Sequence, residues 1–290
     1  MKKYFRMGLF LISYLVSTAL EAASILAYSD VYQDYVKFLK GRSPYDITNF
    51  KGENTRRDVV EIILIQQALK IGGYTGPIKI IHQEVRYRRV LSLVAQGLAD
   101  TVSNSVWLTD VDKKKGQFYI SDILIPEDKF VAGFYVLADK VDRVNIEVRE
   151  DIGKYIAICN INWPVDLAVL KSLNAKCVYS PSWGSMVKML KAKRGDFILT
   201  SFQSTQDLAL QAYGVKLLPV RNIKVSLQER RVFVVSKLSK EGGPIFHALQ
   251  KGIKELMAKG MFDKAYRESG FYNEAVKDWK MIKPKLSNEH

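Results

Sequence analysis

Apolar positions follow two spacings along most of the chain. Runs of consecutive apolar residues predict short buried strands at Ile25–Tyr28, Ile78–Ile81 and Ala99–Ser103. Between them, apolar residues recur at helical spacing over Arg57–Lys70 and Arg88–Gln96, and glycines follow both segments. Strands that alternate with helices indicate parallel pairing, because each crossover helix returns the chain to the same end of the sheet.

The same alternation starts again after residue 150. Two apolar runs flank this second series, Phe130–Leu137 before it and Arg231–Ser236 after it, and two helices separated by Gly260 close the chain. Within the second series we expect strands at Tyr155–Cys159, Cys177–Tyr179, Phe197–Thr200 and Lys216–Pro219, and helices at Asp166–Leu173, Gly184–Ala192 and Gln206–Tyr213.

This order predicts an α/β fold with two lobes, each a mostly parallel sheet flanked by helices, joined by two hinge strands. We expect the first lobe to be discontinuous, with residues 24–134 plus 225–290, and the second lobe to span residues 135–224. Two lobes on a paired hinge can close over a ligand, and open α/β sheets bind ligands at the carboxyl ends of their strands. One binding site between the lobes is therefore expected.

Residues 1–23 have the three-part pattern of a secretory signal peptide. A basic start is followed by an apolar run of 14 residues, Met7–Leu20, and by the small residues Ala22 and Ala23. This run is shorter than the roughly 20 residues that an α-helix needs to cross a bilayer. We expect cleavage near Ala23 or Ser24 and a periplasmic location. Glu21 is unusual beside a cleavage site, so an uncleaved anchor is the alternative.

Charge and composition narrow the possible partners. Without the leader the net charge is +12, and it is spread over the whole length, which does not favour a nucleic-acid partner. The two cysteines, Cys159 and Cys177, are compatible with a disulfide or with two buried thiols. The three histidines lack the spacing of metal ligands, so we expect neither a metal nor a cofactor.

Five segments of the chain, in order, resemble the type II periplasmic solute-binding proteins, specifically the extracellular family 3 typified by amino-acid receptors of ABC transporters. They cover most of the chain beyond the leader and imply the two-lobed fold. The matching segments are Arg57–Ile81, "RVLSLVAQGLAD" at residues 89–100, "ISDILIPEDKFVAGFYVL" at 120–137, "MLKAKRGDFILTS" at 189–201 and the stretch from Arg231 to Phe271.

The ligand residues of that family do not carry over. In amino-acid-binding members, an arginine soon after the fourth strand clamps the ligand carboxylate, whereas only Lys113 and Lys114 lie near that position here. Those members also hold the ammonium group with an acidic residue of the second lobe, and the matching residue is Ser201. The resemblance therefore does not imply an α-amino acid bound in the usual manner.

Aromatic and polar residues follow the predicted strands instead. Trp107, Trp163 and Trp183 each lie just past a strand end, where they could offer flat surfaces to a ligand or simply pack beneath loops. The polar candidates near them are Tyr28, Asn104, Ser105, Thr109, Asn162, Ser182 and Ser201. Asn162 is also a candidate helix cap before Pro164. Arg56 and Arg57 stand at a helix start, where they reach an acidic partner, a ligand or solvent.

We expect a solute-binding protein that captures a small polar or aromatic-stacking ligand for an inner-membrane ABC permease or a sensor protein. The alternatives are a sensory or regulatory protein with a degenerate cleft and a dehydratase-like enzyme on the same fold. For an enzyme, the candidate acid–base groups are Asp30, Asp110, Asp112 and Lys113. None of them forms a recognisable catalytic pair, so no catalytic residue is assigned.

Overall fold

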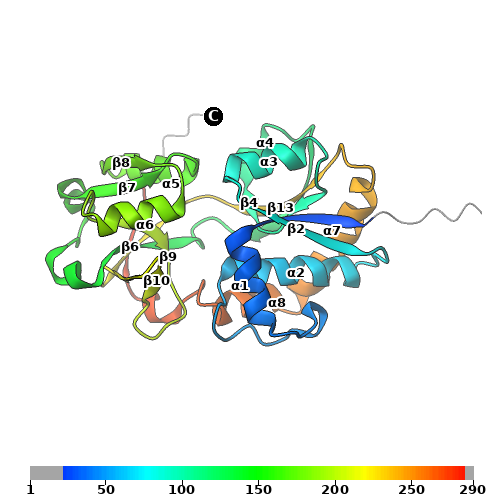
Figure 1. Ribbon diagram of the computed structural model, residues 1–290, viewed down its shortest axis with the longest axis horizontal. Helices are drawn as coiled ribbons and strands as arrows, with labels where there is room; N and C mark the ends of the chain where they lie inside the picture. Colours follow the sequence, from blue (N-terminus) through cyan, green and yellow to red (C-terminus); the bar gives the residue numbers. More distant parts are fainter. Residues whose placement is uncertain (1–21, 285–290) are drawn as a thin grey trace, which may run out of the picture.

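The computed structural model describes residues 22–284, which form two lobes side by side (Figure 1). Residues 1–21 of the predicted signal peptide lie outside this range. Strand β1 begins at Ala23, so the predicted leader of residues 1–23 overlaps the first strand by one residue. Within residues 22–284, no helix is both long enough and apolar enough to span a membrane.

The first lobe is built on a six-stranded mixed sheet. Its order is β2-β1-β3-β13-β4, and β5 also pairs with β13. Strand β1 is parallel to β2 and β3, as predicted, whereas β13 is antiparallel to its neighbours. The strands are β1 (Ala23–Tyr28), β2 (Ile78–Gln83), β3 (Thr101–Val102), β4 (Val106–Trp107), β5 (Phe118–Ile125) and β13 (Arg231–Ser236).

Helices cover this sheet, and α2 is the most deeply buried of them. Every residue from Val59 to Leu69 of α2 is buried, which fits its lack of a polar face. Helix α1 was not predicted, although Val31, Tyr35 and Phe38 give it an apolar face. The helices are α1 (Ser29–Leu39), α2 (Arg57–Ile71), α3 (Tyr87–Ala95), α4 (Leu108–Asp112), α7 (Gly242–Ala258) and α8 (Met261–Glu268), with a short η1 (Pro44–Asp46).

The second lobe has a six-stranded sheet and a separate parallel pair. The sheet order is β10-β11-β6-β12-β14, with β9 also pairing with β6, and the pair is β7-β8. The strands are β6 (Val131–Leu137), β7 (Ile156–Asn160), β8 (Lys176–Ser180), β9 (Ile198–Ser201), β10 (Leu210–Ala212), β11 (Val215–Pro219), β12 (Ile223–Ser226) and β14 (Lys280–Ile282). The helices are α5 (Pro164–Ser172), α6 (Trp183–Lys191), η2 (Ala138–Arg143), η3 (Arg149–Lys154) and η4 (Glu274–Val276).

Strand direction in this second sheet differs from the expectation of mostly parallel pairing. Strand β6 is antiparallel to β9, β11 and β12, because the chain enters the lobe through β6 and turns back against it. Only β12 and β14 are parallel in this sheet. The predicted parallel arrangement holds for β7 and β8, which are joined through helix α5.

The predicted hinge strands correspond to β6 and β13. The chain crosses from one large sheet to the other in the short segments next to these strands. Strands β6 and β13 each belong to one sheet, and residues 126–130 and 227–230 make the passage. These links touch, since the Leu227 backbone N–H donates to the Phe130 carbonyl at 3.0 Å. A third passage, residues 269–279, leads from α8 to β14. The predicted lobe boundaries fall inside β6 and β12, and that division remains a prediction.

The helix predicted at Gln206–Tyr213 is wrong, because the segment contains a hairpin strand. Strands β10 and β11 pair with Ala212 opposite Val215. The two residues between them, Tyr213 and Gly214, have φ values of 48° and 72°. This left-handed pair forms a tight turn that matches strand twist. Turn geometry therefore decides the local structure here against the helical spacing.

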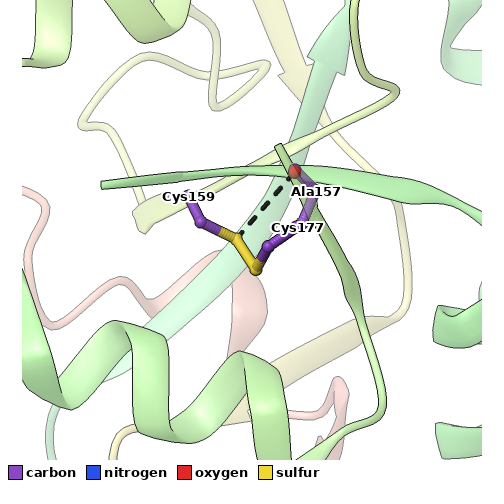
Figure 2. Close-up of a disulfide and its surroundings, with 3 residues drawn as sticks. All are labelled: Ala157, Cys159 and Cys177. Atoms are coloured by element: carbon purple, nitrogen blue, oxygen red, sulfur yellow. Dashed lines mark hydrogen bonds between the residues drawn. A yellow bond between two sulfur atoms is a disulfide. The ribbon is translucent and has the colours of Figure 1, made fainter. Parts of the chain in front are cut away.

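The two cysteines form a disulfide between β7 and β8, which the sequence had left open (Figure 2). Their Cα atoms are 5.6 Å apart. The strand register places Cys177 opposite Ala157 rather than opposite Cys159, so the bridge runs diagonally across the pair. The disulfide ties together the two strands whose carboxyl ends carry Trp163 and Trp183.

Removing this disulfide should destabilise the protein. The bridge joins residues 18 apart in sequence, and loops of about this size gain roughly 3 kcal/mol from a cross-link. We expect the Cys159→Ala, Cys177→Ala double variant to lose about that much in urea-induced unfolding. A loss well below 1 kcal/mol would contradict a stabilising role.

Close packing of α2 against α7 gives a second prediction. A Cβ atom at Gly252 of α7 would lie 1.9 Å from the carbonyl oxygen of Ala68 in α2. Gly252→Ala should therefore destabilise the protein by about 1–3 kcal/mol in thermal or urea unfolding. The control is Gly116→Ala, where a Cβ meets nothing within 4 Å. Equal stability of the two variants would show that the helices tolerate the extra atom.

Candidate functional site

A buried chain of hydrogen bonds begins at Arg231, the first residue of β13. Arg231 is 5% exposed, its Nε donates to Ser105 Oγ at 2.9 Å, and its Nη2 donates to the Ser105 carbonyl. The Ser105 backbone N–H and hydroxyl both donate to Glu61, at 2.8 and 2.7 Å. The Tyr266 hydroxyl donates to the same carboxylate at 3.0 Å. These bonds fix β13, the β3–β4 loop, α2 and α8 to one another.

Aromatic rings surround the guanidinium of Arg231. The Cζ atom of Arg231 lies 4.3 Å from the ring centroid of Trp107 and 5.6 Å from that of Phe130. Trp107 is 4% exposed, and its ring centroid is 5.0 Å from that of Phe130. The sequence predicted Trp107 as a surface for a ligand or as a residue that packs beneath a loop. In the structure its buried ring lies against the Arg231 guanidinium, and a contact with a ligand stays a prediction.

A second guanidinium, that of Arg57, shares the ring of Phe130. The Cζ atom of Arg57 lies 5.1 Å from the ring centroid of Phe130 and 5.7 Å from that of Phe271. Its Nη2 donates to the carboxylate of Asp58. Its Nη1 is buried and has no hydrogen-bond partner, and no other buried side-chain nitrogen or oxygen in residues 22–284 shares that condition. An orphaned donor of this kind is costly and rare in folded proteins.

Asp58 is shared among several donors. Arg56 Nη1 lies 3.2 Å from it, and Asn104 Nδ2 donates to it at 3.1 Å. Burial opposes ionisation of Asp58, but the charges of Arg57 and Arg56 outweigh burial and lower its pKa. Asp58 therefore stays ionised and divides one negative charge between two guanidiniums.

The sequence left open whether Arg56 contacts an acidic partner, a ligand or solvent, and in the structure it contacts acidic partners. Besides Asp58, its guanidinium pairs with Asp30 at 2.9 Å and with Asp34 at 3.0 Å. Both partners lie on α1, so Arg56 ties α1 to the start of α2. Its role is an acidic contact within the first lobe, in contrast to Arg57, whose guanidinium points toward Phe130.

Burial also shifts the ionisation of the neighbouring groups. It lowers the pKa of Arg231, and the nearby positive charge of Arg57 lowers it further. It raises the pKa of Tyr28 at the end of β1, where Asp58 adds to the effect. It raises the pKa of Asp110, which the hydroxyl of Tyr87 contacts at 2.8 Å.

The second lobe contributes one carboxylate to this region, that of Asp166 in the first turn of α5. Burial raises the pKa of Asp166 to about 6, while its own backbone N–H and the charges of Arg231 and Arg57 act in the opposite direction. Asp110 of the first lobe raises it slightly. Asp166 is therefore electrostatically coupled to both guanidiniums of the first lobe.

Trp163 and Trp183 form an aromatic pair in the second lobe. Their rings stack with centroids 6.4 Å apart and planes inclined by 22°. Asn162 joins the two loops, because its Nδ2 donates to the Pro181 carbonyl at 2.9 Å. The cap of α5 is Trp163 rather than Asn162, and Pro164 takes the first helical position as predicted. Ser182 caps α6 through its hydroxyl.

The structure divides the predicted site residues into two groups and leaves two apart. Tyr28, Asn104, Ser105 and Trp107 lie around Arg57 and Arg231 in the first lobe, whereas Asn162, Trp163, Ser182 and Trp183 lie together in the second. Thr109 is exposed on α4, and Ser201 ends β9 with its carbonyl accepting from Gln203. Whether these residues contact a ligand stays a prediction.

Sequence reasoning missed Arg231, Glu61, Asp58 and Asp166 as members of this region. One signal was present, since Arg231 begins a strand whose other five residues, up to Ser236, are apolar or small. A charge in that position invites a search for its partner. The partner, Ser105, is 126 residues away in sequence, which no local pattern reveals.

Two shallow hollows lie on the first lobe, away from these residues. One, of about 420 Å³, is lined by residues of the α2 end and the α7 start, including His247. The other, of about 430 Å³, lies between Lys51 and α8. Neither contains the guanidiniums or the aromatic pair.

Solved structures of known proteins share this fold. One is an amino-acid ABC transporter substrate-binding protein from Streptococcus pneumoniae bound to L-arginine, with 14% identity, a TM-score of 0.54, and coverage of 88% of this chain and 96% of that one. Another is the periplasmic VFT2 domain of BvgS from Bordetella pertussis, with 10% identity, a TM-score of 0.52, and coverage of 85% and 92%. A third is an ancestral amino-acid-binding protein, a precursor of cyclohexadienyl dehydratase, with 15% identity, a TM-score of 0.50, and coverage of 85% and 95%.

No family model and no curated protein matches the sequence. At these identities the structural similarity shows the fold alone. It confirms the predicted fold class, the two-lobed α/β architecture of the type II periplasmic binding proteins.

The raised pKa of Asp166 predicts a pH effect on stability. A carboxyl whose pKa is higher in the folded protein than in the unfolded chain binds its proton more tightly when folded, so stability falls as the pH rises from about 4 to about 6. Asp166→Asn should remove this part of the decline, measured as the free energy of unfolding across that range. The control is Asp142→Asn, at an exposed carboxyl of the same lobe, which should keep the wild-type slope. Identical slopes for wild type and Asp166→Asn would contradict the raised pKa of Asp166.

Proposed function

We propose that this chain is an exported solute-binding protein that captures a small ligand between its two lobes. The observation that carries the proposal is the arrangement of two lobes that each place polar and aromatic side chains after their strands, with Arg231 and Arg57 of the first lobe near enough to lower the pKa of Asp166 in the second, against the larger effect of burial. Charged groups of opposite sign from two lobes can bind a polar ligand from both sides. Lobes linked at residues 126–130 and 227–230 can open and close around it.

The compartment is supported by two independent features. The sequence begins with the pattern of a secretory signal peptide. The disulfide between Cys159 and Cys177 is of a kind that persists in oxidising compartments and is rare in the cytosol. A periplasmic location fits both, and an exported binding protein works there.

For the ligand itself we propose a small polar molecule that contacts Trp163 and Trp183. These two rings are partly exposed and lie at the carboxyl ends of β7 and β8. The disulfide and Asn162 hold the two loops in register, so the rings form a rigid surface. For Trp107 we propose a different role, packing against the Arg231 guanidinium, because its ring is buried.

Similar folds occur in both transport and sensing proteins, so we propose an ABC permease or a sensor as the partner class. Permease and ATPase genes beside this one would support transport. A neighbouring sensor-kinase gene would support signalling and would contradict a transport role.

Binding rather than turnover is the activity that we propose. An enzyme of the dehydratase type is the second candidate, because Asp166 has a pKa near 6, which suits a general acid. NMR of an identified ligand incubated with the protein distinguishes the two. An unchanged spectrum supports binding, and a new set of product signals would establish catalysis.

A thermal-shift screen of the mature protein against a metabolite library tests the binding function. We expect at least one compound to raise the unfolding temperature, and Trp163→Ala to weaken its affinity by about tenfold, since aromatic contacts contribute on the order of 1 kcal/mol. Trp279→Phe is the control, because Trp279 packs edge-on against Phe202 and a phenyl ring keeps that contact. A library without any stabilising compound, or equal affinity in the Trp163 variant, would contradict the proposed site.

A further inference from the structure

Arg231 carries a buried charge without an ionised partner. Among residues 22–284 it forms no ion pair, and its Nε and Nη2 donors go to the neutral hydroxyl and carbonyl oxygens of Ser105. Arginines that are 95% removed from solvent are normally paired with a carboxylate or another anion, because an unpaired buried charge is strongly destabilising. The guanidinium of Arg231 is therefore suited to an anionic partner that comes from outside the chain.

Arg57 lacks a hydrogen-bond partner for one of its donors. Its Nη1 is the buried donor without a partner, and its charge lies over the same ring, that of Phe130, as the charge of Arg231. Asp58 pairs with Nη2 of Arg57 and also contacts Arg56 and Asn104, so Nη1 is the donor of Arg57 that stays open to a further acceptor. Two guanidiniums thus stand around one phenyl ring with unsatisfied capacity for an anion.

The carboxylates nearby make no hydrogen bond or ion pair with Arg231 within residues 22–284, although the charges of Glu61 and Asp58 raise its pKa against the larger effect of burial. Glu61 accepts from the backbone and hydroxyl of Ser105 and from Tyr266, which are all neutral donors. Asp166 senses both guanidiniums, yet in the described part of the chain it forms no ion pair with either. A ligand anion would supply the direct contact that these carboxylates do not make with Arg231.

We propose that Arg231 and Arg57 form the anion subsite of the binding site and that the ligand carries a single carboxylate. This inference rests on the proposed function and specifies its ligand class. Guanidinium groups bind carboxylates through paired N–H donors. A singly charged group fits better than a dianion, because Asp58 and Glu61 lie close enough to repel a second negative charge. The subsite lies on β13 and α2, away from Lys113 and Lys114.

Small anions test the subsite in the wild-type mature protein. We would compare the unfolding temperature of the protein in sodium acetate, sodium phosphate and sodium chloride, at constant ionic strength and a pH of about 7.5. We expect acetate at roughly ten times its dissociation constant to raise the unfolding temperature by about 3 °C relative to chloride. A smaller phosphate effect supports a monoanion subsite. No effect of acetate, or a stronger effect of phosphate, would overturn the proposal.

Variants then locate the anion. Arg231→Lys keeps the charge but loses the paired donors, and Arg57→Gln removes the charge at the more exposed of the two groups. Both should lose the acetate shift, whereas Arg221→Gln, at an exposed position of the second lobe, should keep it. If Arg231→Lys does not fold, Arg57→Gln alone decides the outcome. Retention of the shift in Arg57→Gln would overturn the assignment.

The metabolite screen separates this inference from the function on which it rests. A library compound whose affinity is the same in wild type and Arg57→Gln would leave the binding function standing and refute the anion subsite. An acetate shift that depends on Arg57, without any stabilising metabolite, would support the subsite and remove support for the proposed function.

Discussion

The burial of the Arg231 guanidinium is the constraint on which the first lobe depends. A positive charge inside a protein must be solvated by fixed dipoles or by an opposite charge. Here Ser105 supplies two oxygens, and Ser105 is in turn held by Glu61 of α2. The strand, the loop and the helix are therefore placed by one polar chain, while Trp107 and Phe130 exclude water from it. Within residues 22–284 the same arrangement gives the Arg231 guanidinium no ion pair.

The second lobe has a cross-linked aromatic surface of its own. A disulfide fixes β7 to β8, Asn162 fixes the loops that follow them, and Trp163 stacks on Trp183. Asp166 lies three residues after Trp163 in the same lobe. The charges of Arg231 and Arg57 lower its pKa, against the larger effect of burial. Each lobe thus presents a preformed set of groups, and the links at residues 126–130, 227–230 and 269–279 join the two sets.

The alternation of strands and helices could be predicted from sequence because burial leaves a local signature, as in Ile25–Tyr28 and the apolar positions of α2. The hairpin at Tyr213 could not, since a two-residue turn overrode the helical spacing. Three tryptophans were predicted from their positions after strands, and two of them do lie together. Arg231 escaped prediction because its partners come from segments more than 100 residues away, and hydrogen bonds at that separation have no sequence period.

A crystal structure of the mature protein with the tightest ligand from a metabolite library would test this account most directly. The account predicts a carboxylate of that ligand within hydrogen-bond distance (~3 Å) of Arg231 or Arg57, with the rest of the molecule between these residues and Asp166. A ligand bound at Lys113 and Lys114, or in a hollow on the outside of the first lobe, would contradict it.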